Sequence, residues 1–197
     1  MNKKSFAIKY ACWRNLFLTT LLGFFITSFS IKTFAMPNVE AAFSSVTFQS
    51  ANNNSLYLNK FKGKVVVLFF GYTHCPDICP TTLLDISRAI NELGEDVDRV
   101  QPIFISVDYK RDTPQSLAQY TAYFNKHILG ITSDKENIDE ITKLFKTSYA
   151  LLDHQSKNYL VEHSSNIYII DENLIVQRII SNGLPYLEIT KAIKSLL

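Results

Sequence analysis

Cysteine is scarce in this sequence. The chain has three cysteines among 197 residues, and only Cys75 and Cys79, four positions apart, follow the first 35 residues. A disulfide between these two would close a very short loop, which adds little chain-entropy stabilisation. The sequence therefore excludes a domain held together by disulfides. The pair instead indicates disulfide exchange or a soft metal ion, with a buried apolar pair as the plain alternative.

An excess of basic charge is also lacking. Residues 1–35 hold five of the 20 Lys and Arg residues, so residues 36–197 hold 15 of them against 18 Asp and Glu. A nucleic-acid-binding domain needs a basic surface, and this balance argues against that class. The sequence shows no internal repeat, and its 47% hydrophobic content is enough for one domain with a core.

Acidic residues are absent before Glu40. Four basic residues precede an uncharged, mostly apolar run at 16–31, which is typical of a membrane-targeting segment. The 17 residues between Arg14 and Lys32 reach the short limit of ~17–25 residues for a spanning helix, while TFA at 33–35 fits a cleavage site. We expect residues 1–35 to be a signal or membrane-anchor segment. The basic residues before the run predict that residues 36–197 are exported, to the periplasmic side of a bacterial inner membrane.

The patterns after residue 43 predict one α/β domain. Alternating apolar and polar residues around an Asn-rich turn predict an N-terminal β-hairpin at 44–58. Continuous apolar runs and helical spacing predict the other elements. The strands are expected at 64–73, 100–108, 158–163 and 166–180, the last with a turn at 171–173, and the helices at 83–93, 112–127, 133–150 and 184–197. This order predicts a mixed central sheet with helices on both faces, and a thioredoxin-like fold is the candidate.

Two helices carry signals at their first turns. Pro114 fits the first position of the helix at 112–127, where a missing N–H costs nothing. Ser133 and Glu136 have the spacing of a capping box for the next helix. We therefore expect that helix to begin directly after Ser133.

The cysteines stand where the first long strand ends and a helix begins. In an open α/β sheet this crevice, beyond the carboxyl end of a central strand, is the usual place for chemistry. Unpaired N–H groups at a helix N-terminus favour a thiolate and lower its pKa from ~8.5 into the ~3.5–7.5 range. Pro76 and Pro80 fit a pair that straddles the loop and the first helical turn.

Proline is missing from one place where a thioredoxin-like oxidoreductase needs it. Such enzymes have a cis-proline before a late strand, facing the cysteines, but this chain has no proline between Pro114 and Pro185. His163 stands there instead, followed by Ser-Ser-Asn. Of the other histidines, we expect His74 to tune the site locally, and we expect the remaining two to lie at a helix end and in a loop. A site made of two cysteines and His163 is therefore geometrically credible, although a lone histidine is often structural.

Three sequence blocks together resemble one known family. GKVVVLFFGYTHCPDICPTTL, ISVDYKRDT and VEHSSNIYIID are similar to the signature blocks of the Sco/SenC family of copper-binding assembly factors for cytochrome c oxidase. The resemblance covers about residues 40 to 197. It implies a thioredoxin fold, an N-terminal membrane anchor, and copper held by Cys75, Cys79 and His163. It also implies a partner, the copper-accepting subunit of cytochrome c oxidase.

The departures from the family pattern are mild. Tyr109 stands where proline is usual, Glu162 where an aspartate commonly precedes the histidine, and the asparagines at 52–54 where a glycine turn is usual. None of them falls on an implied ligand. Asp77 and Asp108 lie near the expected site, and we expect them to support the turn, because Cu(I) has little use for carboxylates. Tyr72 is expected to pack.

The residue types themselves favour copper. Thiolates select Cu(I), and an imidazole makes Cu(II) tolerable as well, so two sulfurs and one nitrogen suit both states. A structural zinc site would need a fourth ligand and usually a C-x2-C spacing. Forming the disulfide would use both thiolates, so oxidation of the pair must expel the copper.

Two other classes stay open beside the metallochaperone. A thiol-disulfide reductase would use Cys75 as nucleophile and Cys79 as the resolving thiol, and the resemblance makes this a second candidate activity. A thiol peroxidase would need proline and threonine at the positions of Leu68 and Tyr72, so its motif is not met.

Overall fold

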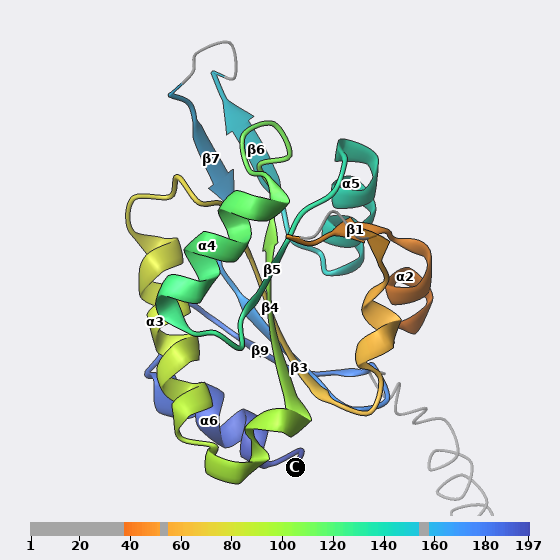
Figure 1. Ribbon diagram of the computed structural model, residues 1–197, viewed down its shortest axis with the longest axis vertical. Coiled ribbons are helices and arrows are strands. Elements are labelled where there is room, and N and C mark those ends of the chain that lie inside the picture. The colour runs from red at the N-terminus through yellow and green to blue at the C-terminus, as the bar shows by residue number, and fades with distance from the viewer. Residues whose placement is uncertain (1–37, 52–54, 154–157) are drawn as a thin grey trace, which may run out of the picture. The chain divides into compact units, whose positions relative to one another are not determined.

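The computed structural model describes residues 38–51, 55–153 and 158–197 of the chain (Figure 1). The expected targeting segment, residues 1–35, and His154 lie outside this part. No helix within the described ranges has both the length and the apolar composition that crossing a membrane requires.

Nine strands and five α-helices make up the described part of the chain. The strands are β1 (Phe48–Gln49), β2 (Ser55–Leu56), β3 (Val65–Gly71), β4 (Val100–Ser106), β5 (Leu129–Ile131), β6 (Tyr149–Leu152), β7 (Leu160–His163), β8 (Ile167–Ile170) and β9 (Val176–Ile180). The α-helices are α2 (Glu40–Ser45), α3 (Ile78–Asn91), α4 (Pro114–Phe124), α5 (Lys135–Leu144) and α6 (Tyr186–Lys194), and two 3-10 turns span Leu58–Phe61 and Gly94–Arg99.

The central sheet is mixed, as the sequence predicts. Its strand order is β5-β4-β3-β8-β9, with β3 parallel to β4 and antiparallel to β8. Every residue of β3 is buried, because β3 lies in the middle of the sheet and has helices on both sides. The short β1–β2 pair is the expected N-terminal hairpin.

Alternate residues of β3 build the two faces of the core. Phe69 packs against Phe104 on the side of α3 and α4, while Phe70 packs against Tyr168 and Phe145 on the side of α2 and α5. This division follows from the two-residue repeat of a strand. Figure 1 shows α3, α4 and α6 on one side of the sheet and α2 and α5 on the other, which confirms helices on both faces.

The helix starts confirm one expectation and correct another. Pro114 begins α4, and the hydroxyl of Thr113 before it accepts a hydrogen bond from the backbone N–H of Ser116. The predicted capping box at Ser133 and Glu136 is wrong. Asp134 caps α5 instead, because its short carboxylate reaches the N–H of Asn137, while the Ser133 hydroxyl donates to the carbonyl of Thr47.

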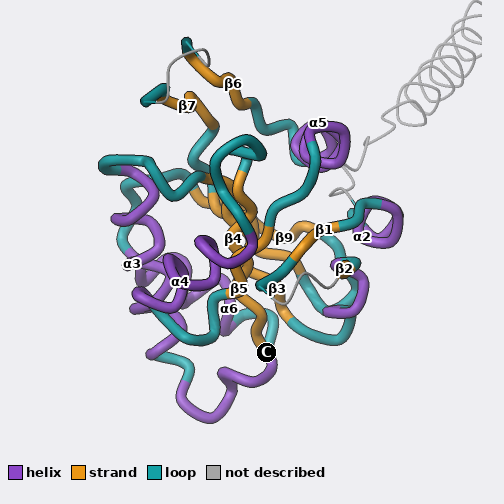
Figure 2. Tube along the Cα trace, turned by 45° about the horizontal axis from the view of Figure 1, so that its top comes forward, coloured by secondary structure: helices purple, strands orange, loops and turns teal. Residues whose placement is uncertain are grey.

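The segment predicted as a helix at 133–150 ends in a strand. Helix α5 ends at Leu144, and residues from Tyr149 onward form β6, which pairs with β7 in a two-stranded antiparallel ribbon. This β6–β7 hairpin extends beyond the carboxyl ends of β3 and β4, and both views show it standing away from the main sheet (Figures 1 and 2). Its last residue is His163, so the hairpin carries the histidine to the level of the cysteine loop.

Candidate metal centre

The two cysteines take the positions expected at the end of β3. The strand ends at Gly71, a loop carries Cys75, and Cys79 is the second residue of α3. Pro80 follows in the first helical turn, where an α-helix has no partner for the backbone N–H. The loop and the helix start therefore hold both sulfurs at the same end of the sheet.

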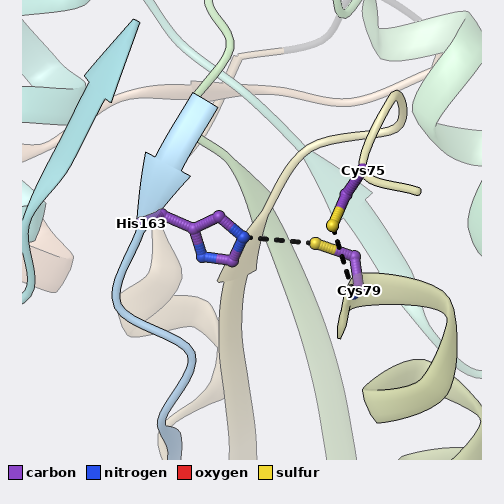
Figure 3. Close-up of side chains that lie close together, drawn as sticks. All are labelled: Cys75, Cys79 and His163. Atoms are coloured by element: carbon purple, nitrogen blue, oxygen red, sulfur yellow. Dashed lines mark hydrogen bonds between the residues drawn. The ribbon is translucent and has the colours of Figure 1, made fainter. Parts of the chain in front are cut away.

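Cys75, Cys79 and His163 come together although 84 residues separate Cys79 from the histidine. One possible ligand atom from each lies within 4.8 Å of the others, and the sulfur of Cys79 is 3.3 Å from Nε2 of His163 (Figure 3). Both cysteines are free thiols. Two sulfurs and one nitrogen form a donor set for a soft or borderline cation.

The imidazole of His163 has a defined tautomer. Its Nδ1 lies 3.0 Å from the carbonyl oxygen of Ser164. A carbonyl oxygen only accepts hydrogen bonds, so the proton of the neutral ring is on Nδ1. The Nε2 atom then carries a lone pair, and it points at the sulfur of Cys79 (Figure 3). This is the arrangement that metal-binding histidines need.

Aromatic rings hold the imidazole in place. The ring of Tyr72 meets His163 edge-on at 5.8 Å between centroids, and the ring of Phe69 meets it at 6.2 Å. Both aromatic residues are buried. The packing role expected for Tyr72 is in keeping with these contacts.

Gly71 makes room for Cys79. A Cβ atom at this position would lie 2.8 Å from the Cys79 sulfur and 2.6 Å from the ring of Phe104. Both distances are far below van der Waals contact, so only glycine lets the sulfur approach the end of β3 this closely.

The two thiols have different acidities. Hydrogen bonding with the side chain of Cys79 and with the backbone N–H groups of Asp77 and Cys79 lowers the pKa of Cys75 to about 4. The same hydrogen bond to Cys75, together with burial, raises the pKa of Cys79 well above its usual value. The partly exposed Cys75 is therefore the thiolate, and the buried Cys79 keeps its proton.

Asp112 fixes the loop that carries Cys75. Its buried carboxylate accepts hydrogen bonds from the backbone N–H of Thr73 at 2.9 Å and from the hydroxyls of Thr73 and Ser106. Thr73 precedes the cysteine by two residues, and Ser106 ends β4. The carboxylate therefore ties the cysteine loop to the neighbouring strand.

Arg111 fixes the hairpin that carries His163. Its guanidinium pairs with the buried carboxylate of Asp108 at 2.6 Å and donates to the carbonyl of Tyr159 at 2.8 Å. It also stacks on the Tyr159 ring, 3.5 Å from the centroid, and that tyrosine's hydroxyl donates to Asp108. Tyr159 directly precedes β7, so this network joins the loop after β4 to the strand that ends at His163.

The sequence predicts the hydrogen-bond networks of Asp112 and Arg111 only in part. Asp108 is expected to support the site, and it does so through Arg111 and Tyr159 rather than through the cysteines. The roles of Asp112 and Thr73 depend on the packing of β4 beside β3, which no spacing in the sequence shows. Asp77 is exposed, and its backbone carbonyl accepts a hydrogen bond from the hydroxyl of Thr81.

His74 does not join the cysteines. Its side chain points to solvent, and its Nδ1 lies 3.0 Å from the Thr73 hydroxyl. Together with Asp108 and Asp112 it forms a second group of possible ligand atoms within 4.8 Å. Both carboxylates in that group already accept hydrogen bonds from other side chains, so the cysteine centre is the better candidate.

Comparison with known proteins finds one family. The family model described as SCO1/SenC matches residues 35–197. A SCO2-like protein of Rickettsia conorii is 37% identical over 130 residues, which are 64% of this chain and 63% of the relative. Protein sco1 of Schizosaccharomyces pombe is 39% identical over 145 residues, covering 72% of this chain and 54% of the relative. The chain thus matches somewhat over half the length of these relatives.

Solved structures give the same result for the fold. The structure of Bradyrhizobium japonicum ScoI with copper bound superposes with a TM-score of 0.71 at 31% identity, covering 77% of this chain and 97% of that one. Arabidopsis thaliana ScoI with copper bound gives a TM-score of 0.69 at 28% identity, covering 76% and 96%.

Proposed function

This chain belongs to the SCO1/SenC family, and from that premise we propose that it is a copper chaperone for cytochrome c oxidase. It binds copper through Cys75, Cys79 and His163, and it delivers the metal to the copper-accepting subunit of the oxidase or prepares the thiols of that subunit. Residues 1–35 export the domain formed by residues 36–197 to the periplasmic side of the inner membrane, where it is anchored or released.

The meeting of three soft or borderline donors is the observation that supports this proposal best. Cys75 and Cys79 come from the end of β3 and the start of α3, and His163 comes from the end of β7. The proton on Nδ1 leaves the Nε2 lone pair free toward the sulfurs. Relatives with this fold have been solved with copper bound, which supports copper as the cargo.

The donor set suits copper in both oxidation states. Two thiolates satisfy Cu(I), and the imidazole adds the nitrogen that Cu(II) prefers. No described side chain supplies a fourth ligand in this group, as a structural zinc site would need. Oxidation of the two sulfurs to a disulfide removes both thiolates, so the same pair couples copper release to redox state.

Thiol-disulfide reduction is the second candidate, and the inequality of the two thiols favours it. The Cys75 thiolate attacks a disulfide of the acceptor, forming a mixed disulfide and releasing one acceptor thiolate. Cys79 then loses its proton to the first acceptor thiolate and attacks the sulfur of Cys75, which releases the second acceptor thiolate. The dithiol gives two electrons to the acceptor disulfide, and Cys75 and Cys79 end as a disulfide.

The variant His163→Ala tests the copper proposal. Two thiolates still hold Cu(I) in a roughly linear arrangement, whereas Cu(II) loses its only nitrogen side-chain ligand. We expect Cu(II) affinity to fall by about 100-fold, and Cu(I) affinity by less, in titrations of the reduced protein. The dithiol potential, measured in a glutathione series, should shift by less than about 30 mV.

Cysteine variants provide the controls. Cys75→Ser and Cys79→Ser should each abolish stable Cu(I) binding while the far-UV circular dichroism stays native, because a hydroxyl replaces each thiol with little change of volume. Unchanged Cu(II) affinity in His163→Ala would remove the histidine from the site and leave the reductase as the better function. Peroxide turnover by the metal-free dithiol would instead support a thiol peroxidase.

A further inference from the structure

A groove of about 390 Å³ lies beside the cysteine centre, between the cysteine loop and the β6–β7 hairpin. One wall is the start of α3 with Ile78, and the other is the hairpin with Leu152 and Leu160. Cys75 and His163 also line the groove. The groove is therefore continuous with the proposed copper site.

The walls of this groove expose large aliphatic side chains. Ile78 is 40% exposed, Leu152 is 39% exposed and Leu160 is 56% exposed. Leu152 and Leu160 are cross-strand partners, so their side chains stand on the same face of the hairpin. A cluster of exposed aliphatic residues beside a reactive group is typical of a surface that another molecule covers.

The groove gives access to a sulfur. Cys79 is completely buried, whereas Cys75 is only partly buried and lines the groove. A partner that takes copper by sulfur ligation, or that presents a disulfide, must bring its own sulfur to Cys75. Its chain then lies over Ile78 and against the hairpin.

The charges around the groove select the partner further. Asp77 and Glu162 are the only charged residues among the described residues that line it, apart from the titratable cysteine and histidine, and both are acidic and exposed. A partner segment with a basic residue near its cysteine complements this rim, while an acidic segment is repelled.

We propose that this groove docks a cysteine-bearing segment of the acceptor protein. A large apolar side chain of that segment lies among Ile78, Leu152 and Leu160, and a basic side chain faces Asp77 and Glu162. Docking brings the segment's sulfur against Cys75. The inference rests on the proposed function and deepens it, since it specifies the chemistry of the acceptor.

Disulfide exchange with two synthetic peptides tests the groove. Each peptide carries one cysteine as a mixed disulfide with thionitrobenzoate, in the sequence Lys-Leu-Cys-Leu-Lys or Glu-Ser-Cys-Ser-Glu. The Cys75 thiolate attacks the peptide sulfur, the bond to the aromatic sulfur breaks, and the coloured thionitrobenzoate anion leaves with the electron pair. Initial second-order rates are measured with the reduced protein at pH 7, in excess peptide.

The reduced protein should react at least about tenfold faster with the apolar, basic peptide than with the acidic one. Leu160→Ser should reduce that preference by about fivefold, roughly what one partly buried aliphatic side chain contributes. Leu184→Ser is the matched control, because Leu184 is 48% exposed and lines a different groove, between β9 and α6, and should keep the preference. Ile78→Ser repeats the test from the opposite wall, should the hairpin variant fail to fold.

The difference in reactivity between the two probe peptides in the absence of the groove is measured with a peptide of residues 69–83 that carries Cys79→Ser, so that Cys75 is its one thiol. A preference ratio in the intact protein no larger than in this peptide would overturn the proposal, as would an unchanged ratio in both Leu160→Ser and Ile78→Ser. Copper titration of the same samples distinguishes a failure of the docking groove from a failure of the proposed copper-chaperone function. Copper binding without peptide preference rejects only the groove, and peptide preference without copper binding rejects the chaperone function and leaves a docking thiol reductase.

Discussion

At the scale of single residues, the site depends on differences between atoms that look equivalent in the sequence. Neither Cys75 nor Cys79 is in a disulfide, yet the sulfur of Cys75 is partly exposed and accepts hydrogen bonds from backbone N–H groups, while Cys79 is buried. His163 likewise presents one nitrogen to a carbonyl and the other to sulfur. Each side chain therefore has one role that its neighbours determine.

The acidity of Cys75 predicts an unusual pH dependence of alkylation. Its folded pKa is lowered to about 4, so the thiolate is present above that pH and is lost as the pH falls through it. The rate of modification by iodoacetamide in the reduced, metal-free protein should be level between about pH 6 and 8 and half-maximal near pH 4. Peptide mass spectrometry identifies the modified cysteine.

Cys79 should remain unmodified over this range, because its raised pKa and its burial keep it a protonated, inaccessible thiol. The third cysteine of the chain, Cys12, is followed separately through its own peptide in the same digest. A Cys75 rate that still climbs tenfold per pH unit between pH 6 and 8 would show an ordinary thiol and contradict the proposed hydrogen bonding.

The sequence is sufficient to select the three candidate ligands, but not to explain their geometry. Two cysteines four positions apart at the end of a buried strand are visible as a pattern, and the missing proline draws attention to His163. The contact of Gly71 with the Cys79 sulfur and the hydrogen bonds of Asp112 cannot be predicted from the sequence in this way. They depend on how β3 and β4 lie side by side, and no local spacing encodes that.

At the scale of elements, the end of β3 is the structural basis of the site. The strand brings Gly71 to the centre of the sheet's carboxyl edge, where β4 and α3 both contact it. The loop that follows can then place Cys75 over the start of α3. A side chain at Gly71 would separate these elements.

Gly71→Ala should therefore damage the site more than the fold. The added methyl would lie 2.8 Å from the Cys79 sulfur, so the sulfur must move. We expect Cu(I) affinity to fall by at least about tenfold and stability to fall by about 1–3 kcal/mol, as for other overpacked cores. Competition with a Cu(I) chelator and chemical denaturation give the two quantities.

Gly183→Ala is the control for a general loss of stability. Gly183 has φ +87°, and no atom lies within 4 Å of the position that an added methyl would take, so alanine strains the backbone there without touching the cysteines. It should lower stability and leave copper affinity unchanged. An equal loss of affinity in both variants would mean that Gly71 acts through stability and not through the position of the sulfur.

Long elements are more predictable than short ones. The buried runs of β3 and β4 and the apolar faces of α3 and α5 extend over enough residues to show their period. Strand β5 has three residues and β6 has four, too few for any period to appear. Their positions come from pairing with β4 and β7 instead, so the sequence predicts β7, within the strand expected at 158–163, but not its partner β6 in the hairpin.

At the scale of the whole molecule, the first residues that the structure describes already belong to the domain. Asn38 forms a β-bridge with Ile175, and the backbone N–H of Val39 donates to the carbonyl of Leu174. Helix α2 follows immediately, and its Phe43 is completely buried against Phe145. The first described residues therefore already pack against the rest of the domain.

This arrangement predicts where the chain can be shortened. A polypeptide of residues 37–197 retains the Asn38 bridge and α2, so we expect it to be monodisperse without detergent and to bind one copper per chain. A polypeptide of residues 47–197 loses α2 and with it Phe43 and Val46, both fully buried. Its stability should be lower by about 3 kcal/mol or more, the loss typical of removing one buried phenylalanine. Light scattering, copper analysis and urea denaturation compare the two polypeptides. Aggregation of the longer polypeptide would place the domain boundary before residue 37. Equal stability of both would show that α2 contributes nothing to the core.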